Sequence, residues 1–495
     1  MQRSNSNSHL DDSDNFGCLS GSGADLSRYQ EQLARERNSR TLNLRHINRI
    51  SIGSVLQNNS HLSIGAKGFI DPNNFPFLDS SKFAEAVNSN NIPQVTQYVQ
   101  SVANIAAHSP RMLNTLLNQD FINFIINCFS NCDSEMLMQI MRFLGVVFPY
   151  CGSFQTQISE EIICSFFDLF DSTSPNMLLS TFGLISVMSS ASSIARDSFI
   201  TYGFHMNLIE IAHEERSLEL TRGACAALYS IFSNNDPIDN EILIEIVPKL
   251  AELLKLHDKL SITNVIECFV EMTNKYNQLV FNLYECGIYP LSIEMLKDEE
   301  LVGPTLHLVG DLSVAERHEV KVLIDNGVLP ILNQLLKTEY VADAFWVLSN
   351  LLERTPDDVI PYCDQSFIQT VIDITTSSNY EIQKEGSFFL STLIFLTPNT
   401  NLQFFMTDTI LDILVQMINC GVSYFILRCI DTFIKILRYV QVSMDTSSNF
   451  FSELLETDLK DNLEELIESE KGLILDKAAY LLRLIDYIEK ETKNE

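Results

Sequence analysis

The sequence predicts an all-α protein in which one helical unit is repeated along the chain, and two observations support this. First, Gly203, Gly287 and Gly327 each precede a short apolar run that continues into an amphipathic helix. Gly287 and Gly327 are roughly 40 residues apart, and Gly203 and Gly287 are about twice as far apart. A weaker copy of the apolar run, at 246–254, lies about midway between Gly203 and Gly287. Second, no segment shows the sustained alternation of apolar and polar residues that is typical of a half-buried strand.

Fainter copies of the apolar run extend the repeat through most of the chain. They keep the period at roughly 40 residues and lie at 120–130, 160–170, 364–374 and 409–418. Helical units of about 40–47 residues are typical of HEAT and armadillo solenoids, in which each unit buries its apolar face by stacking on its neighbours. A chain of 495 residues built in this way needs no division into separate globular cores.

The only tryptophan, Trp346, lies in the run AFWVLSN and is followed four residues later by Asn350. Residues four apart lie on one face of a helix, one turn from each other. Such a pair suits an extended peptide, because an indole can flank a long or cationic side chain and an amide can bond the ligand backbone. The alternative is a core tryptophan beside an unrelated asparagine, and the repeated setting favours the binding surface.

The order of several motifs resembles the armadillo repeats of importin-α, the nuclear-import adaptor. The runs that carry the resemblance are RDSFITYG (196–203), RGACAALYSIFSNNDP (222–237), PTLHLVGDLS (304–313), VLIDNGVLPILNQLL (322–336), AFWVLSNLL (344–352) and KEGSFFLST (384–392). The resemblance covers roughly residues 80–490. It implies a right-handed superhelical solenoid of about nine to ten armadillo repeats over 79–450, closed by an atypical capping repeat at 451–495.

The amino-terminal segment differs in composition from the rest. Residues 1–27 are rich in Ser, Asn, Asp and Gly, which predicts a disordered tail. Residues 28–50 are rich in arginine and resemble the importin-β-binding segment of the family, whereas 51–78 form a polar linker. The resemblance implies that the carrier importin-β binds Arg35, Arg37, Arg40, Arg45 and Arg49. The alternative is an unstructured basic tail.

Placing the Trp/Asn pair on each repeat gives a ladder of positions, one pair in each repeat. Its pairs are Arg142/Val146, Gly183/Val187, Ala226/Ser230, Glu267/Glu271, His307/Asp311, Trp346/Asn350 and Phe388/Thr392. In the family this ladder lines a groove for basic nuclear-localisation signals. The early pairs lack the Trp and Asn, and Arg142 would repel a cationic side chain.

The later pairs keep an aromatic side chain with an acid one turn before it. A carboxylate at that distance from a ring suits Lys or Arg, because the ring contacts the stem and the acid contacts the head. The predicted peptide-binding residues are Trp346, Asn350, Asp343, Phe388, Glu385, Thr392, His307, Asp311, Glu267 and Glu271.

Charge and cysteine usage limit the other classes of function. The net charge is -31, and a protein this acidic repels nucleic-acid phosphates and attracts basic partners. Cysteines fall within apolar helical runs, where free thiols act as small core residues, at positions 128, 164, 225, 268 and 429. No signal peptide opens the chain, and the apolar stretches 177–188 and 388–398 are too short to cross a bilayer. We therefore expect a reduced intracellular protein without membrane insertion.

Two hypotheses of function follow. The first is a nuclear-import adaptor that binds basic signals of cargo proteins, links them to importin-β, and shuttles between cytoplasm and nucleus. In the family the carboxy-terminal repeat, here 463–490, helps to bind the export receptor that recycles the adaptor. The second is an armadillo scaffold of the β-catenin kind, without import-signal binding. Motifs of phosphate-binding loops, zinc proteases and serine hydrolases are missing, so we expect no enzyme, no cofactor and no metal.

Overall fold

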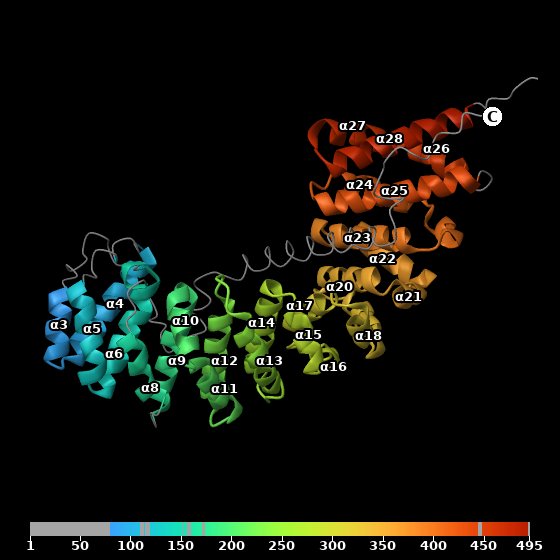
Figure 1. Ribbon diagram of the computed structural model, residues 1–495. Helices are drawn as coiled ribbons and strands as arrows, with labels where there is room; N and C mark the ends of the chain where they lie inside the picture. Colours follow the sequence, from blue (N-terminus) through green and yellow to red (C-terminus); the bar gives the residue numbers. More distant parts are fainter. Residues whose placement is uncertain are drawn as a thin grey trace, which may run out of the picture. The chain divides into compact units, whose positions relative to one another are not determined.

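The computed structural model describes residues 80–108, 113, 119–150, 152–155, 160–170, 174–443 and 448–493 (Figure 1). By their described residues, these form two compact units, 80–347 and 348–493. The boundary falls inside α20 (Val341–Arg354), which carries residues of both. All regular elements in the described ranges are helical. The predictions for the tail, the arginine-rich segment and the linker lie outside these ranges.

The N-terminal unit is a stack of helices in which one long helix of each repeat packs against the corresponding helix of the next repeat. Its elements are α3 (Ser80–Asn88), α4 (Ile92–His108), α5 (Gln119–Asn131), α6 (Ser134–Val147), η3 (Phe148–Tyr150), α7 (Gly152–Gln155), α8 (Glu160–Phe170), α9 (Pro175–Ala191), α10 (Ser193–Thr201), α11 (Phe204–His213), α12 (Leu218–Ser233), α13 (Asn240–Leu253), α14 (Lys259–Lys275), α15 (Leu279–Glu285), α16 (Ile288–Met295), α17 (Val302–Leu312), α18 (Arg317–Asp325), α19 (Val328–Leu335) and the first half of α20. We call α4, α6, α9, α12, α14 and α17 the ladder helices of this unit, because each packs against the next in this order.

Three glycines turn the chain where the sequence predicts it. Gly203, Gly287 and Gly327 have φ angles of 80°, 74° and 85° and begin α11, α16 and α19. A Cβ at any of the three would meet no atom within 4 Å. Glycine is therefore required at these positions by the left-handed backbone conformation, which residues with a Cβ rarely adopt. It is not required because space for a side chain is missing. The weaker copy at 246–254 has no such glycine, and α13 runs through it as one continuous helix that includes Pro248.

Polar caps set the starts of several ladder helices. Asp133, Ser217 and Asp258 accept hydrogen bonds from backbone N–H groups in the first turns of α6, α12 and α14. These bonds satisfy donors that a helix start leaves without partners. Arg222 of α12 also donates to both carboxylate oxygens of Asp258, at 2.6–3.1 Å. The arginine and the capping bonds lower the pKa of Asp258 to about 2, so one carboxylate caps α14 and joins it to α12.

The C-terminal unit repeats the same packing. Its elements are the second half of α20, α21 (Pro356–Val359), η4 (Ile360–Tyr362), α22 (Gln365–Ser377), α23 (Tyr380–Leu396), η5 (Asn399–Phe405), α24 (Asp408–Ile418), α25 (Ser423–Ser443), α26 (Ser448–Glu456), α27 (Leu459–Ser469) and α28 (Leu473–Thr492). Here α23, α25 and α28 are the ladder helices, each packed against the next. A buried ion pair between Lys477 and Asp431 joins α28 to α25. The predicted all-α repeat solenoid is confirmed.

The cysteines mostly lie where the sequence predicts them. Cys128, Cys225, Cys268 and Cys429 are buried, and burial raises the pKa of the Cys225 thiol to about 12. The prediction for Cys164 is wrong, because this thiol is exposed on α8. The buried side of α8 holds Ile163, Phe166 and Leu169, and Cys164 lies about 100° around the helix from Ile163. None of the described helices is long and apolar enough to span a bilayer.

Candidate peptide-binding face

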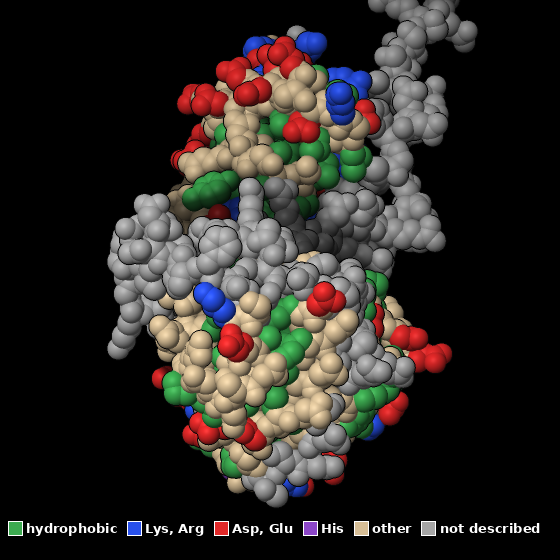
Figure 2. Space-filling view, turned by 90° about the vertical axis from the view of Figure 1, so that its left-hand side faces the viewer, with side chains coloured by type: hydrophobic (Ala, Val, Ile, Leu, Met, Phe, Trp, Pro, Cys, Tyr) green, Lys and Arg blue, Asp and Glu red, His purple; other side chains and the backbone are tan. Residues whose placement is uncertain are grey.

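The predicted peptide-binding residues lie on four helices, divided between the two units. We call the set on α14, α17 and the first half of α20 the acidic face: Glu267, Glu271, His307, Asp311, Asp343 and Trp346. The remaining residues belong to the C-terminal unit and are Asn350, Glu385, Phe388 and Thr392. Acidic side chains are also scattered over the visible surface of both units rather than confined to one region (Figure 2).

Trp346 packs against a glycine that the sequence analysis missed. A Cβ at Gly310 of α17 would lie 1.9 Å from Cζ3 and 2.0 Å from Cη2 of the indole. Only a glycine leaves room for the ring at this distance. Trp346 is 0% exposed, and Asn350, one turn later on α20, is buried as well. A ligand therefore reaches the indole only if the atoms around it move.

Asp343 and His307 approach each other across neighbouring helices of the acidic face. The distance from His307 Nε2 to Asp343 Oδ2 is 3.9 Å, and the two side chains are 10% and 22% exposed. Asp343 lies in the first turn of α20, one turn before Trp346. It is thus a partly accessible carboxylate at the position where the sequence predicts contact with a ligand cation.

The other acids of this face have contacts within the protein. Asp311 accepts a hydrogen bond of 2.8 Å from the hydroxyl of Thr273 on α14. Glu271 lies 3.5 Å from Lys275, whose ammonium also donates to the carbonyl groups of Phe232 and Asn234 at the carboxy-terminal end of α12. Burial lowers the pKa of Lys275 despite these contacts. The face therefore carries four carboxylates against one lysine, and its net charge favours a cationic ligand.

In the C-terminal unit the ring of Phe388 is surrounded by the protein itself. The ring centroids of Phe425 and Tyr424 lie 4.8 Å and 5.9 Å away, both edge to face. The guanidinium of Arg428 lies 5.9 Å from the Phe388 centroid. The aromatic wall predicted for a ligand cation thus has a cation of this chain beside it. The hydroxyl of Thr392 is buried without a hydrogen-bond partner.

The sequence analysis did not include Arg428 among the ladder positions, although the repeat spacing predicts it. It follows Phe388 by one repeat of about 40 residues, and Thr432 follows Thr392 by the same interval. Arg428/Thr432 is therefore the next pair of the ladder. Arg428 is fully buried and pairs at 2.6 Å with Glu353, whose side chain is 4% exposed. The guanidinium carbon of Arg428 lies 4.8 Å from the ring centroid of Phe395.

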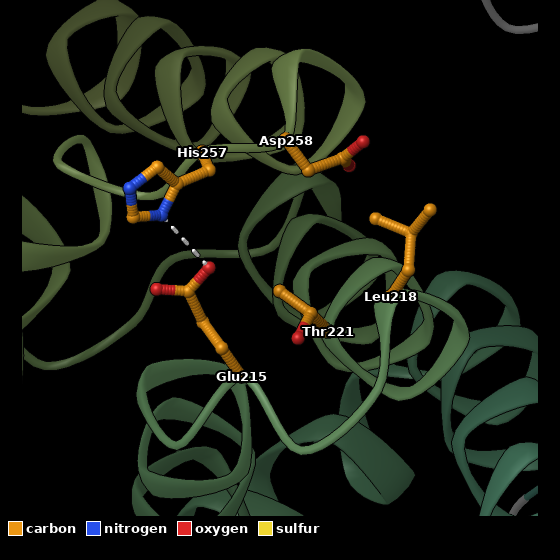
Figure 3. Close-up of a pocket in the computed structure, with 5 residues that line it drawn as sticks. All are labelled: Glu215, Leu218, Thr221, His257 and Asp258. Atoms are coloured by element: carbon orange, nitrogen blue, oxygen red, sulfur yellow. Dashed lines mark hydrogen bonds and ion pairs between the residues drawn. The ribbon is translucent and has the colours of Figure 1, made fainter.

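A surface depression of about 350 Å³ lies at the starts of α12 and α14 (Figure 3). It is lined by Glu215, Leu218, Thr221, His257 and Asp258, and His257 Nδ1 lies 3.3 Å from Glu215 Oε2. None of the predicted peptide-binding residues lines it, and the Asp258 carboxylate is held by Arg222. Throughout the described residues, no three His, Cys, Asp or Glu side chains are placed to hold a metal ion.

Comparisons with known proteins support the fold and do not show a family. No known protein-family model matches the chain. A curated relative, importin subunit alpha-3 of Arabidopsis thaliana, is 23% identical over 147 residues. This stretch is 29% of the present chain and 28% of the relative, so well under two thirds of the relative is matched.

Among solved structures, one engineered protein superimposes with a TM-score of 0.64 at 16% identity, over 82% of this chain and 99% of its own. Two designed armadillo repeat proteins, one in complex with the peptide (KR)4, give TM-scores of 0.40 and 0.41. They cover 46% and 48% of this chain, at 18% and 20% identity. The stacked helical repeats of this chain, together with its superposition on the engineered protein, show that the chain is an all-α repeat solenoid.

Proposed function

We propose that this protein is a nuclear-import adaptor of the importin-α type, which binds basic localisation signals of cargo proteins on the acidic face. The observation that carries the proposal is that Glu267, Glu271, Asp311 and Asp343 lie on α14, α17 and the first half of α20, the last of which also carries Trp346. A lysine or arginine of the ligand would place its stem toward the indole and its charge toward Asp343. The weak relationship to a plant importin α-subunit supports the same assignment.

The rest of the proposal concerns partners. Residues 28–50 would bind importin-β through Arg35, Arg37, Arg40, Arg45 and Arg49. The carboxy-terminal repeat would contribute to binding the export receptor, and the protein would shuttle between cytoplasm and nucleus. The net charge of -31 supports partners with a basic surface rather than nucleic acid.

The second candidate is an armadillo scaffold that does not bind import signals. It is favoured by the burial of Trp346 and by Arg428 beside Phe388, since both leave less aromatic surface for a ligand cation. The two functions differ in one measurable property. An adaptor binds a basic peptide at the acidic face, with an affinity that falls as salt screens the charges over a Debye length of ~8 Å.

The single tryptophan makes the binding test specific to this face. On titration of the full chain with a peptide of alternating Lys and Arg, we expect the emission of Trp346 to change, because the ligand must disturb its surroundings. By calorimetry, Trp346→Ala and Asp343→Lys should each weaken binding about five- to thirty-fold, equivalent to about 1–2 kcal/mol. Asn350→Ala should weaken binding of every basic peptide alike, because an amide that bonds the backbone does not distinguish side chains.

The matched control is Arg142→Ala, at the equivalent ladder position on α6. Removing this cation should leave peptide affinity unchanged or slightly higher. If Trp346→Ala binds like the parent while Arg142→Ala loses affinity, the ligand uses the other end of the ladder. If the parent binds no basic peptide, the scaffold is the better description.

Deleting residues 1–50 tests the carrier. We expect the truncated protein to lose capture by importin-β while it keeps its helical circular dichroism, since the described repeats begin at Ser80. Basic-peptide binding measured in parallel shows whether the acidic face is intact. Capture of importin-β by the truncated protein would contradict the assignment of residues 28–50.

A further inference from the structure

A buried histidine, His205, lies at the start of α11, two residues after the left-handed turn at Gly203. The residue is 7% exposed, and its ring nitrogen Nδ1 is buried without a hydrogen-bond partner. The preceding Phe204 is fully buried, and the ring centroids of Phe167 and Phe170 lie 4.4 Å and 5.3 Å from its own. A protonated imidazole at this position would lose its hydration without gaining a hydrogen bond at Nδ1.

The charges around His205 do not offset this cost. Glu245 of α13 favours the cationic ring and Lys249 of the same helix opposes it, and these two residues pair with each other at 2.9 Å. Burial is the largest influence, and it lowers the pKa of His205 to about 4. On α11 itself the other titratable residues are Glu210 and His213. The remaining charged residues of the helices packed against α11 are Arg196 and Asp197 on α10, Glu219 and Arg222 on α12, and Glu241 and Glu252 on α13.

We propose that His205 is an acid-sensitive latch on α11: the helix stays packed while the ring is neutral, and protonation of the ring favours an opened helix. In the opened helix the ring is hydrated and has the ordinary histidine pKa of about 6.5. Because the pKa is lower in the packed helix, the neutral ring stabilises packing above pH ~6.5, and this stabilisation is lost as the pH falls toward 4. An opened α11 would expose Phe204 and the rings around it.

The test measures amide hydrogen exchange by mass spectrometry in the full chain at pH 7.5 and 5.5. Correction for the intrinsic pH dependence of exchange leaves the equilibrium between packed and opened helix. With a pKa of about 4 in the packed helix and about 6.5 in the opened one, opening of α11 should increase about tenfold at the lower pH. The internal reference is α25, because residues 348–493 contain no histidine. Its opening should change less than about twofold.

Two variants assign the effect to one ring. His205→Gln has no titrating group at this position, so the ratio of α11 opening between the two pH values should be less than about twofold, whatever its value at pH 7.5. The matched control is His213→Gln, which removes an exposed histidine of the same helix and should keep the tenfold increase.

The proposal is overturned if His205→Gln keeps the tenfold increase or if opening of α11 in the parent does not depend on pH. The parent is decisive even if His205→Gln does not fold. An increase at α25 as large as that at α11 would mean that groups other than histidine cause the acid response, and it would overturn the proposal as well.

Discussion

Replacing Arg428 by Leu should lower the free energy of unfolding by about 3–5 kcal/mol, because it leaves Glu353 charged and buried without its partner. Both side chains are almost fully buried, and Arg428 Nη2 lies 2.6 Å from Glu353 Oε1. A lone carboxylate in this environment loses its hydration and gains no counter-charge in return. Urea unfolding followed by circular dichroism measures the change.

The pair is stabilised incompletely, which makes its replacement informative. Arg428 Nε, Arg428 Nη1 and Glu353 Oε2 are buried without hydrogen-bond partners. The rings of Phe395 and Phe388 lie beside the guanidinium, and their cation–π attraction replaces part of the hydration that it has lost. Replacing a buried ion pair by apolar residues is often neutral or stabilising. We therefore expect the double variant Arg428→Leu/Glu353→Leu to recover most of the lost stability.

The matched control is Arg438→Leu on the same helix. Arg438 donates to the Tyr480 hydroxyl at 2.8 Å in an exposed position, so its loss should cost less than about 1 kcal/mol. If the double variant is as unstable as Arg428→Leu alone, the loss comes from the packing of the guanidinium on the two rings. That result would contradict the explanation from charge.

Much of this fold could be predicted because it depends on local chemistry that recurs. A glycine at a left-handed turn leaves the same signal at Gly203, Gly287 and Gly327, and the period follows from their spacing. The continuous helix α13 could not be predicted in the same way, because Pro248 lies inside it and no glycine marks a break. Cys164 shows a similar limit, since one position on an amphipathic helix decides between core and solvent.

The candidate site could be predicted only as a row of positions. The repeat interval of roughly 40 residues separates Glu271 from Asp311, and Asp343 lies one turn before the next ladder residue, Trp346. Their partners depend on how neighbouring helices are aligned in space: Thr273 reaches Asp311 from 38 residues away. The contact of Gly310 with Trp346 is of the same kind. A missing side chain leaves no pattern in the sequence, although it decides whether the indole fits.

That contact leads to the other large expected effect: Gly310→Ala should destabilise the protein by about 3 kcal/mol or more. In an ordinary helix position this substitution would stabilise by about 1 kcal/mol, because alanine has the higher helix propensity. At Gly310 the new Cβ would lie 1.9 Å from the indole of Trp346, which is fully buried and cannot move aside without repacking. The emission of this sole tryptophan should shift in the folded variant.

Gly303→Ala is the matched control, since Gly303 lies in the same helix and its Cβ would meet only Tyr340, at 3.4 Å. This substitution should be neutral or stabilising in urea unfolding. The steric explanation also predicts rescue: in a Trp346→Leu background, which removes the ring, Gly310→Ala should cost less than about 1 kcal/mol. If Gly310→Ala unfolds at the same urea concentration as the parent and leaves the tryptophan emission unchanged, the indole does not lie against Gly310 in solution. If Gly310→Ala lowers stability strongly both in the parent and in the Trp346→Leu variant, the new Cβ clashes with a neighbour of α17 other than the indole.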